Sequence, residues 1–245
     1  MKITDRIYIV GSGNAGMQLS HNRDCNVYIL DCGSEYVLID AGVGLDTDAI
    51  TRHAEQDGID LSRLTHLLLT HPHGDHAGGA SYFQSKYGLK VLATAEAAPW
   101  LEQGDMEKTT LADAIRAGLY PDDFILQPCP VSQIVKENDK IQIGDAQFQV
   151  LETPGHSDGH ASYLWELDGK KLLFSGDAIF AGGKIYIQNS WDCSIQKYAQ
   201  TMAKLNELKV DMLFAGHGPF LLNNAWKHIE TAHQIFERLD IPPNI

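Results

Sequence analysis

The 245-residue chain carries 32 acidic against 19 basic side chains, which leaves 13 formal negative charges, and it contains 11 histidines. A composition of 44% apolar and 21% charged residues is typical of a globular protein and excludes wholesale disorder. The acidic balance argues against a nucleic-acid partner, because polyanion binding needs basic patches that displace counterions. No apolar run approaches the roughly 20 residues of a membrane span, so we expect no membrane partner.

The compartment is predicted from the N-terminal residues and the cysteines. The N-terminal residues lack the apolar run of a signal peptide. The four cysteines form no CxxC pair and are expected to be reduced, buried thiols; they are Cys25, Cys32, Cys129 and Cys193. We therefore expect a cytoplasmic protein.

The first half of the chain alternates predicted strands with helices. Runs rich in β-branched and aromatic residues predict strands over 7–10, 26–30 and 36–40, the last two joined by a turn. A helix is predicted from Asp46 to Gly58 and another over 75–87, closed by Gly88. Apolar strands are predicted over 67–70 and 90–95.

A helical insertion is predicted over about 96–130, with an apolar face that suits a lid over the site, a dimer contact or core packing. Strands then resume over 140–143, 147–151, 162–167 and 171–174. A helix over 194–208, a strand over 210–214 and a helix over 221–239 follow. This order predicts an α/β protein of two mixed sheets packed together with helices outside, forming one domain over 1–245.

The glycine-rich segment Gly11–Gly16 matches GxGxxG after a predicted strand. A dinucleotide site also needs a helix directly after the glycines, and residues 17–24 are too short and polar to supply it. We interpret the segment as a loop beside the active site.

The strongest functional signal is the segment 70–76, which reads THPHGDH and follows an apolar strand. It places His71, His73, Asp75 and His76 at a strand-to-helix junction. Imidazole and carboxylate together suit zinc, iron or manganese. Because the loop can turn His71 and His73 one way and Asp75 and His76 another, it can serve two metal ions.

Three further candidate ligands follow apolar strands later in the chain. His156 lies in a TPGH segment, Asp177 in SGD and His217 in GHG. Each stands next to a glycine, which allows close backbone approach. Because the ends of neighbouring strands are where α/β folds assemble sites, we expect these residues to join the histidine cluster.

Together these motifs resemble the metallo-β-lactamase superfamily, over residues 36 to 217. The resemblance implies an αββα sandwich with the site at one edge of its two sheets. It implies that His71, His73 and His156 hold one metal ion, that Asp75, His76 and His217 hold a second, and that Asp177 bridges them. Asp40, at the end of a predicted strand, matches the first motif of the superfamily and is expected to orient a ligand from behind. His66 and His160 are expected to pack in the core or to contact a metal ligand from behind, and not to bind metal themselves.

The implied activity is that of a metal-dependent hydrolase with two divalent ions, zinc by default with iron or manganese as alternatives. A metal-bridged hydroxide would attack an ester-type bond, in a thioester, lactone or other ester, and Asp75 would carry the proton. The alternative is a mononuclear iron oxidoreductase of the same fold, similar to persulfide dioxygenases. A phosphodiesterase or nuclease is a third hypothesis. His73 distinguishes the chain from flavo-diiron oxygen reductases, which have an acidic residue there.

The expected substrate is a small molecule, and four residues are candidates for binding it. Lys184 and Tyr186 are similar to the Lys-x-Tyr element by which glyoxalase II enzymes hold the glutathione carboxylate, although their spacing from Asp177 is shorter here. Phe180 stands where lactonases of the superfamily place a tyrosine. Trp191 and the neighbouring Cys193 are expected to line the pocket. A homodimer is the base-rate expectation.

Overall fold

The computed structural model describes residues 1–245 and contains two β-sheets. The first has six strands in chain order: β1 (Ile7–Gly11), β2 (Val27–Asp31), β3 (Tyr36–Ile39), β4 (Leu64–Leu68), β5 (Lys90–Thr94) and β6 (Gln133–Val135). Strands β1 to β3 pair antiparallel, and β3 to β6 pair parallel. The second sheet has the order β11 (Met212–Ala215), β10 (Lys170–Gly176), β9 (Ala161–Leu167), β8 (Ala146–Glu152) and β7 (Lys140–Ile143). Only β10 and β11 are parallel there.

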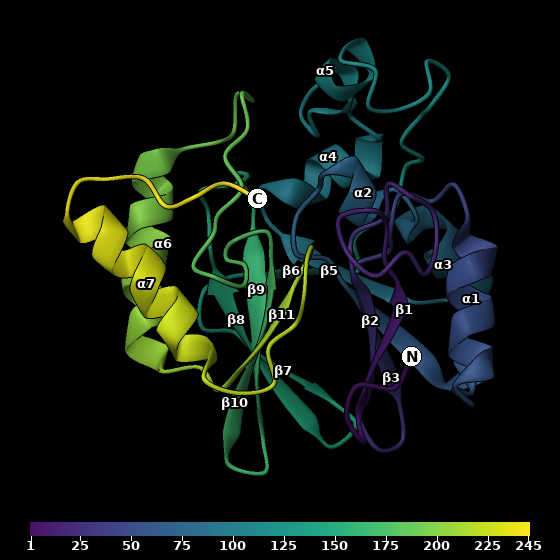
Figure 1. Ribbon diagram of the computed structural model, residues 1–245. Coiled ribbons are helices and arrows are strands. Elements are labelled where there is room, and N and C mark those ends of the chain that lie inside the picture. Colours follow the sequence, from purple (N-terminus) through teal and green to yellow (C-terminus); the bar gives the residue numbers. More distant parts are fainter.

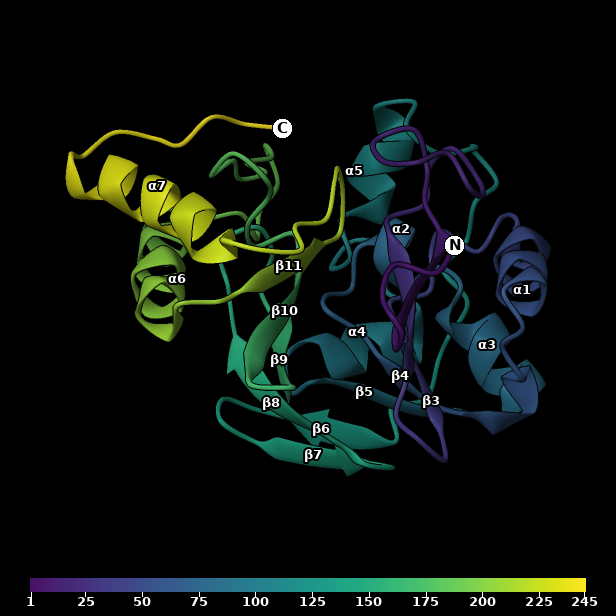
Figure 2. The same ribbon diagram turned by 60° about the horizontal axis from the view of Figure 1, so that its bottom comes forward.

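Helices cover the outer face of each sheet (Figures 1 and 2). On the first sheet lie α1 (Thr47–Gln56), α2 (Gly74–Ala77), α3 (Ala80–Tyr87) and α4 (Ala97–Gln103), with the short 3-10 turn η1 (Leu61–Arg63). On the second lie α6 (Ile195–Leu208) and α7 (Ala225–Glu237). Helix α5 (Leu111–Arg116) stands beyond α4 at one end of the sandwich. The layers are therefore helix, sheet, sheet and helix, which confirms the predicted αββα architecture.

The strands are buried on both faces, because each sheet packs on its partner sheet and on helices. In β2, Tyr28 and Leu30 face the second sheet, while Val27 and Ile29 join the core under α1 and α3. This alternation follows from the two-residue period of a strand. At the middle of the sandwich Tyr28 makes edge contacts with the rings of Phe174 and Phe214. The packing holds the two sheets in one relative position, so their strand ends meet at a common edge.

The structure differs from the helix predicted over 75–87, which it divides into α2 and α3. The backbone N–H of Gly79 donates to the carbonyl of Gly42 (2.9 Å), outside the helix. A Cβ atom at position 79 would lie 2.2 Å from the carbonyl oxygen of Ala41. The break therefore arises from close packing on the segment after β3. A local sequence pattern does not contain that contact.

Two smaller differences are a strand that was not predicted and a helix that begins later than predicted. Strand β6, which has no clear sequence pattern, pairs in parallel with β5. Helix α7 begins at Ala225 rather than near residue 221, because Leu221 forms an isolated bridge with Leu213. None of the helices combines the length and apolar character needed to cross a membrane.

Replacing Gly79 tests the packing that breaks the helix. We expect Gly79→Ala to lower the free energy of unfolding by about 1–3 kcal/mol, because the added methyl overlaps a backbone oxygen that cannot easily move. Ser85→Ala, on the exposed face of α3, is the control and should change the stability by less than about 0.5 kcal/mol. Urea denaturation of both variants measures the difference, and equal stabilities would contradict the packing argument.

Candidate metal centre

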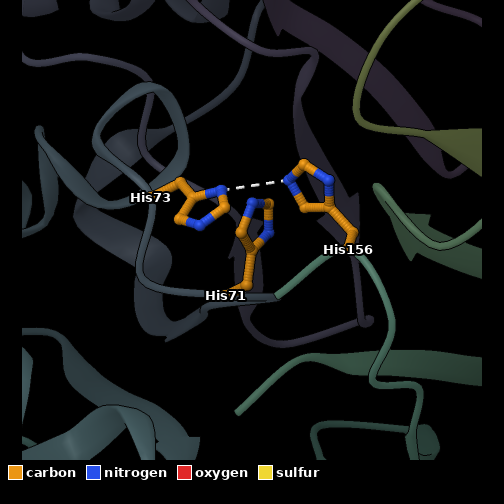
Figure 3. A group of neighbouring side chains, drawn as sticks. All are labelled: His71, His73 and His156. Atoms are coloured by element: carbon orange, nitrogen blue, oxygen red, sulfur yellow. Dashed lines mark hydrogen bonds between the residues drawn. The ribbon is translucent and has the colours of Figure 1, made fainter. Parts of the chain in front are cut away.

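Three histidines converge at the edge between the sheets (Figure 3). His71 and His73 lie in the loop between β4 and α2, and His156 follows β8 of the other sheet. Nδ1 of His73 and Nε2 of His156 are 3.0 Å apart, and the His71 ring packs against both rings. All three side chains are buried. Their candidate ligand atoms lie within 4.8 Å of one another, as one metal ion requires.

A second group lies beside the first and contains Asp75, His76 and His217. Nε2 of His217 is 3.1 Å from Oδ2 of Asp75, and Nε2 of His76 is 3.6 Å from the same oxygen. Asp177, which follows β10, lies between the groups. Its carboxylate oxygens are 3.3 Å from Nε2 of His76, 3.4 Å from that of His217 and 3.5 Å from that of His156. The structure thus brings together all seven ligand candidates that were selected from the sequence.

The unpaired atoms of this cluster fit bound metal ions. Four buried side-chain atoms that could ligate a metal ion have no hydrogen-bond partner in the protein. They are Nε2 of His71, His76 and His217 and Oδ1 of Asp177. An unsatisfied buried polar atom costs about 1–3 kcal/mol, so such atoms are rarely left without a ligand. Imidazole nitrogens and carboxylate oxygens are the ligands that zinc, iron and manganese accept.

The other nitrogen of four of these histidines has a protein partner. Nδ1 of His71 faces the hydroxyl of Thr70 (3.0 Å), and Nδ1 of His156 faces the carbonyl of Tyr186 (2.8 Å). Nε2 of His73 faces Oδ2 of Asp192 (3.0 Å). Nδ1 of His76 faces Oδ2 of Asp40 (2.8 Å), as expected from the sequence for this aspartate. Such partners fix the tautomer and direct the free nitrogen into the site.

Asp40 occupies an unusual backbone conformation at the end of β3. Its φ of 58° lies in the left-handed region, which aspartate tolerates better than most residues. One carboxylate oxygen accepts from the backbone N–H of Thr70 (2.7 Å), and the other accepts from the Thr70 hydroxyl (2.8 Å) as well as facing His76. The carboxylate thereby connects the ends of two neighbouring parallel strands to a ligand candidate.

His160 forms a hydrogen bond with the backbone of Asp177. Its Nε2 accepts the backbone N–H of Asp177 (3.1 Å), so its proton is on Nδ1 and is donated to the hydroxyl of Thr153 (2.8 Å). Its ring stacks on that of His71 at 4.9 Å. Burial lowers the pKa of His160 well below its ordinary value, which keeps the ring neutral. His160 therefore contacts the cluster without being one of its ligand candidates.

The electrostatics of the cluster favour positive charge near Asp75 and Asp177. Burial opposes the charged form of His217, but Asp177 and Asp75 outweigh it and raise the pKa of His217 to about 9. Burial likewise opposes the charge on Asp75, yet His76 and His217 lower its pKa to about 2. In the first group burial dominates and lowers the pKa of His156 to about 4. A dication would take the place of the protons on His76 and His217.

A cavity of about 750 Å³ opens onto the cluster at Asp75 and His217. Asp75 keeps 22% of its side-chain surface exposed, whereas Asp177 is 1% exposed. Residues of the insertion form one wall, including Leu111, Leu119 and Tyr120. The insertion thus covers the site from one side.

Three of the four candidate substrate-binding residues line this cavity: Phe180, Lys184 and Tyr186. The ring of Tyr186 stacks on His156 at 5.2 Å and meets the His217 ring edge-on at 6.2 Å. Trp191 does not line the cavity. It is 48% exposed, and its side chain packs edge-on against Trp100 of α4. Trp191 therefore contacts the insertion and does not line the pocket as predicted.

Two supporting residues were missed from the sequence. Asp192 lies just before α6, whose N-cap is Ser194; the Ser194 side chain accepts from the N–H of Lys197. Asp192 lies 119 residues from His73, so no local spacing indicates their contact. Thr70 directly precedes His71 in the sequence. Its supporting role, however, depends on the hydrogen bond from its hydroxyl to Asp40, which only the fold brings close.

Removing the Asp192 carboxylate tests its role in orienting His73. We expect Asp192→Ala to weaken metal binding about 10–100-fold, because the freed imidazole can rotate and its basicity falls. Asp123→Ala, an exposed substitution in the insertion, is the control. Competition with a chromophoric chelator measures both affinities. Unchanged affinity in Asp192→Ala would contradict this role.

Comparison with curated proteins finds relatives among hydrolases. The chain is 31% identical over 214 residues to the acyl-coenzyme A thioesterase MBLAC2 of Gallus gallus, covering 81% of this chain and 73% of that protein. It is 29% identical over 156 residues to a hydroxyacylglutathione hydrolase of Rhodopseudomonas palustris strain BisB5, covering 63% of this chain. It spans 49% of that hydrolase, about half of its length.

Solved structures share the fold. The subclass B3 metallo-beta-lactamase BJP-1 of Bradyrhizobium japonicum superposes with a TM-score of 0.74 at 22% identity, covering 98% of this chain and 92% of that one. A metallo-beta-lactamase family protein of Thermus thermophilus gives a TM-score of 0.74 at 19% identity, covering 97% and 81%. The sequence model of the metallo-beta-lactamase superfamily matches residues 22–217. With the fold and the ligand cluster, this match shows that the chain belongs to the metallo-beta-lactamase superfamily.

Proposed function

We propose that the protein is a dinuclear metal-dependent hydrolase that cleaves thioesters of small molecules. The observation that carries this proposal is the position of Asp177. Its carboxylate lies within 3.5 Å of histidines from both ligand groups, so it could contact ions held by either group. One ion would be held by His71, His73 and His156, and the other by Asp75, His76 and His217.

Two bound dications would supply a water activated at neutral pH and a Lewis acid for the carbonyl group. The protein itself performs the remaining tasks. Asp75 borders the cavity and keeps part of its carboxylate exposed, so it can accept a proton from the attacking water and return it to the departing thiolate. Asp40, Thr70 and Asp192 hold the ligand histidines in orientation. No side-chain nucleophile is required.

Thioesters are favoured over lactones and other esters by two considerations. The relatives include an acyl-coenzyme A thioesterase and hydroxyacylglutathione hydrolases, which act on thioesters by name. The chain also places Lys184 and Tyr186 together on the cavity wall, next to His217. By contrast, Phe180 stands on the wall without the hydroxyl that lactonases of the superfamily place there.

Asp75→Ala tests the proton carrier. We expect turnover to fall by about 10²–10⁴-fold or more, because both the proton acceptor and one ligand oxygen are lost. The far-ultraviolet circular dichroism should stay unchanged, since Asp75 is at the edge of the cavity. Asp5→Ala, which changes a fully exposed carboxylate, is the control and should keep its activity. Near-normal turnover in Asp75→Ala would refute the assigned role.

Metal analysis together with a substrate panel tests the reaction class. We expect two zinc-like ions per chain, loss of activity on chelation and recovery on addition of zinc. Among acyl thioesters, lactones, β-lactams and phosphodiesters, thioesters should give the highest kcat/KM. One iron per chain with oxygen uptake on a persulfide would replace the proposal with an oxidoreductase of the same fold.

A further inference from the structure

The glycine-rich segment at the N-terminus forms a tight loop beside the metal centre. Between β1 and β2 the chain turns back on itself, with hydrogen bonds from Gly13 N–H to Asp24 and from Asn14 N–H to Asn22, both 2.9 Å. A Cβ atom at position 13 would lie 2.5 Å from the carbonyl oxygen of Asn22. Glycine is therefore required here by the close approach of two chain segments, rather than by a nucleotide phosphate.

The loop is attached to the segments that carry ligand candidates. Gly218 N–H, next to His217, donates to the carbonyl of Ala15 (2.7 Å). The side-chain amide of Asn26 donates to Gly218 (3.0 Å), and its backbone N–H donates to Gly216 (2.6 Å). These bonds fix the loop against the His217 motif. The residues at its tip thus have a defined position relative to the metal centre.

Arg23 lies on this loop and lines the cavity. Its guanidinium is exposed and forms no hydrogen bond or ion pair within the chain. The adjacent carboxylate of Asp24 does not compete for it, because its oxygens accept from Val43 N–H (2.8 Å) and from the Ser20 hydroxyl. Lys184, on another wall of the same cavity, is likewise exposed and unpaired. The cavity therefore presents two free cations from segments far apart in the sequence.

The charge of Arg23 acts within the cavity. Burial raises the pKa of the phenols of Tyr120 and Tyr186, and Arg23 partly opposes this for both. Tyr120 belongs to the insertion, and Tyr186 belongs to the loop that carries Lys184. The positive charge of Arg23 therefore acts on two other walls of the cavity. The formal charge of the chain is −13, and Asp24 and Asp75 also line the cavity, so an anion is attracted only close to Arg23 and Lys184.

We propose that Arg23 binds an anionic group on the thiol carrier of the substrate, which makes the glycine-rich loop part of the substrate site. This inference rests on the proposed thioesterase function and specifies its substrate class. The apolar wall of the insertion, with Leu111 and Leu119, suits the acyl group. The polar carrier then extends toward Arg23 and Lys184. The carrier anion is a carboxylate or a phosphate, and guanidinium binds either in a bidentate manner.

Kinetics on three thioesters with the same acyl group test this proposal. The carriers are coenzyme A, with phosphates, glutathione, with carboxylates, and N-acetylcysteamine, which is uncharged. We expect Arg23→Glu to raise KM about tenfold or more for at least one anionic carrier, with kcat and the neutral substrate changed less than about twofold. The carrier that is affected identifies the anion. Arg23→Lys should recover only part of the affinity, because an ammonium keeps the charge but cannot bind the anion in a bidentate manner.

Lys140→Glu is the matched control, since it makes the same charge change on the exposed edge strand β7, whose residues do not line the cavity. A second readout is calorimetric binding of S-methyl coenzyme A and S-methylglutathione, thioethers that are not hydrolysed. Binding to Arg23→Glu should be about tenfold weaker than to wild type and to Lys140→Glu. The difference should shrink at high salt.

The outcomes separate the two proposals. If no thioester is hydrolysed, including the neutral one, the proposed function fails, and the calorimetric comparison still decides whether Arg23 binds anions. If the neutral thioester is hydrolysed but Arg23→Glu leaves both anionic KM values and both binding constants unchanged, the inference is overturned.

Discussion

The buried carboxylate of Asp177 is the group on which the remaining arrangement depends. Burying a charge without compensation costs on the order of several kcal/mol, and here the compensation comes from histidines of both sheets. The two sheets must therefore pack with their strand ends aligned, or this charge is left unpaired. Protons on His76 and His217 can supply the positive charge, and dications would supply more of it. Metal binding at this point would therefore be coupled to folding.

Residues behind the cluster decide which way its imidazoles point. The carboxylates of Asp40 and Asp192, the Thr70 hydroxyl and the Tyr186 carbonyl each face the outer nitrogen of one histidine. Because these partners belong to rigid strand ends and buried loops, the inner nitrogens are directed before any ion binds. Asp40 holds a strained left-handed backbone conformation in this role, which fits the observation that such strain gathers at functional sites.

The cavity walls come from segments outside the ligand motifs. The insertion supplies an apolar side, the loop after β10 supplies Lys184 and Tyr186, and the glycine-rich loop supplies Arg23. Superfamily members can share a metal centre while differing in these walls, because function resides in the site grafted on a fold. The wall residues and their charges therefore select the substrate class, whereas the metal centre sets the reaction class.

The sequence by itself determined the family, the layer order and the seven candidate ligands, because period-two apolar strands followed by histidine and aspartate beside glycine are local patterns. It also excluded a dinucleotide site at Gly11–Gly16 for lack of a helix. The tertiary structure decided the rest. The division of the helix at Gly79, the contact of Asp192 with His73 and the placement of Arg23 on the cavity all depend on chain segments that are distant in sequence. The prediction that Trp191 lines the pocket was wrong for the same reason. The contact of this loop residue with Trp100 depends on tertiary packing and not on its neighbours in the chain.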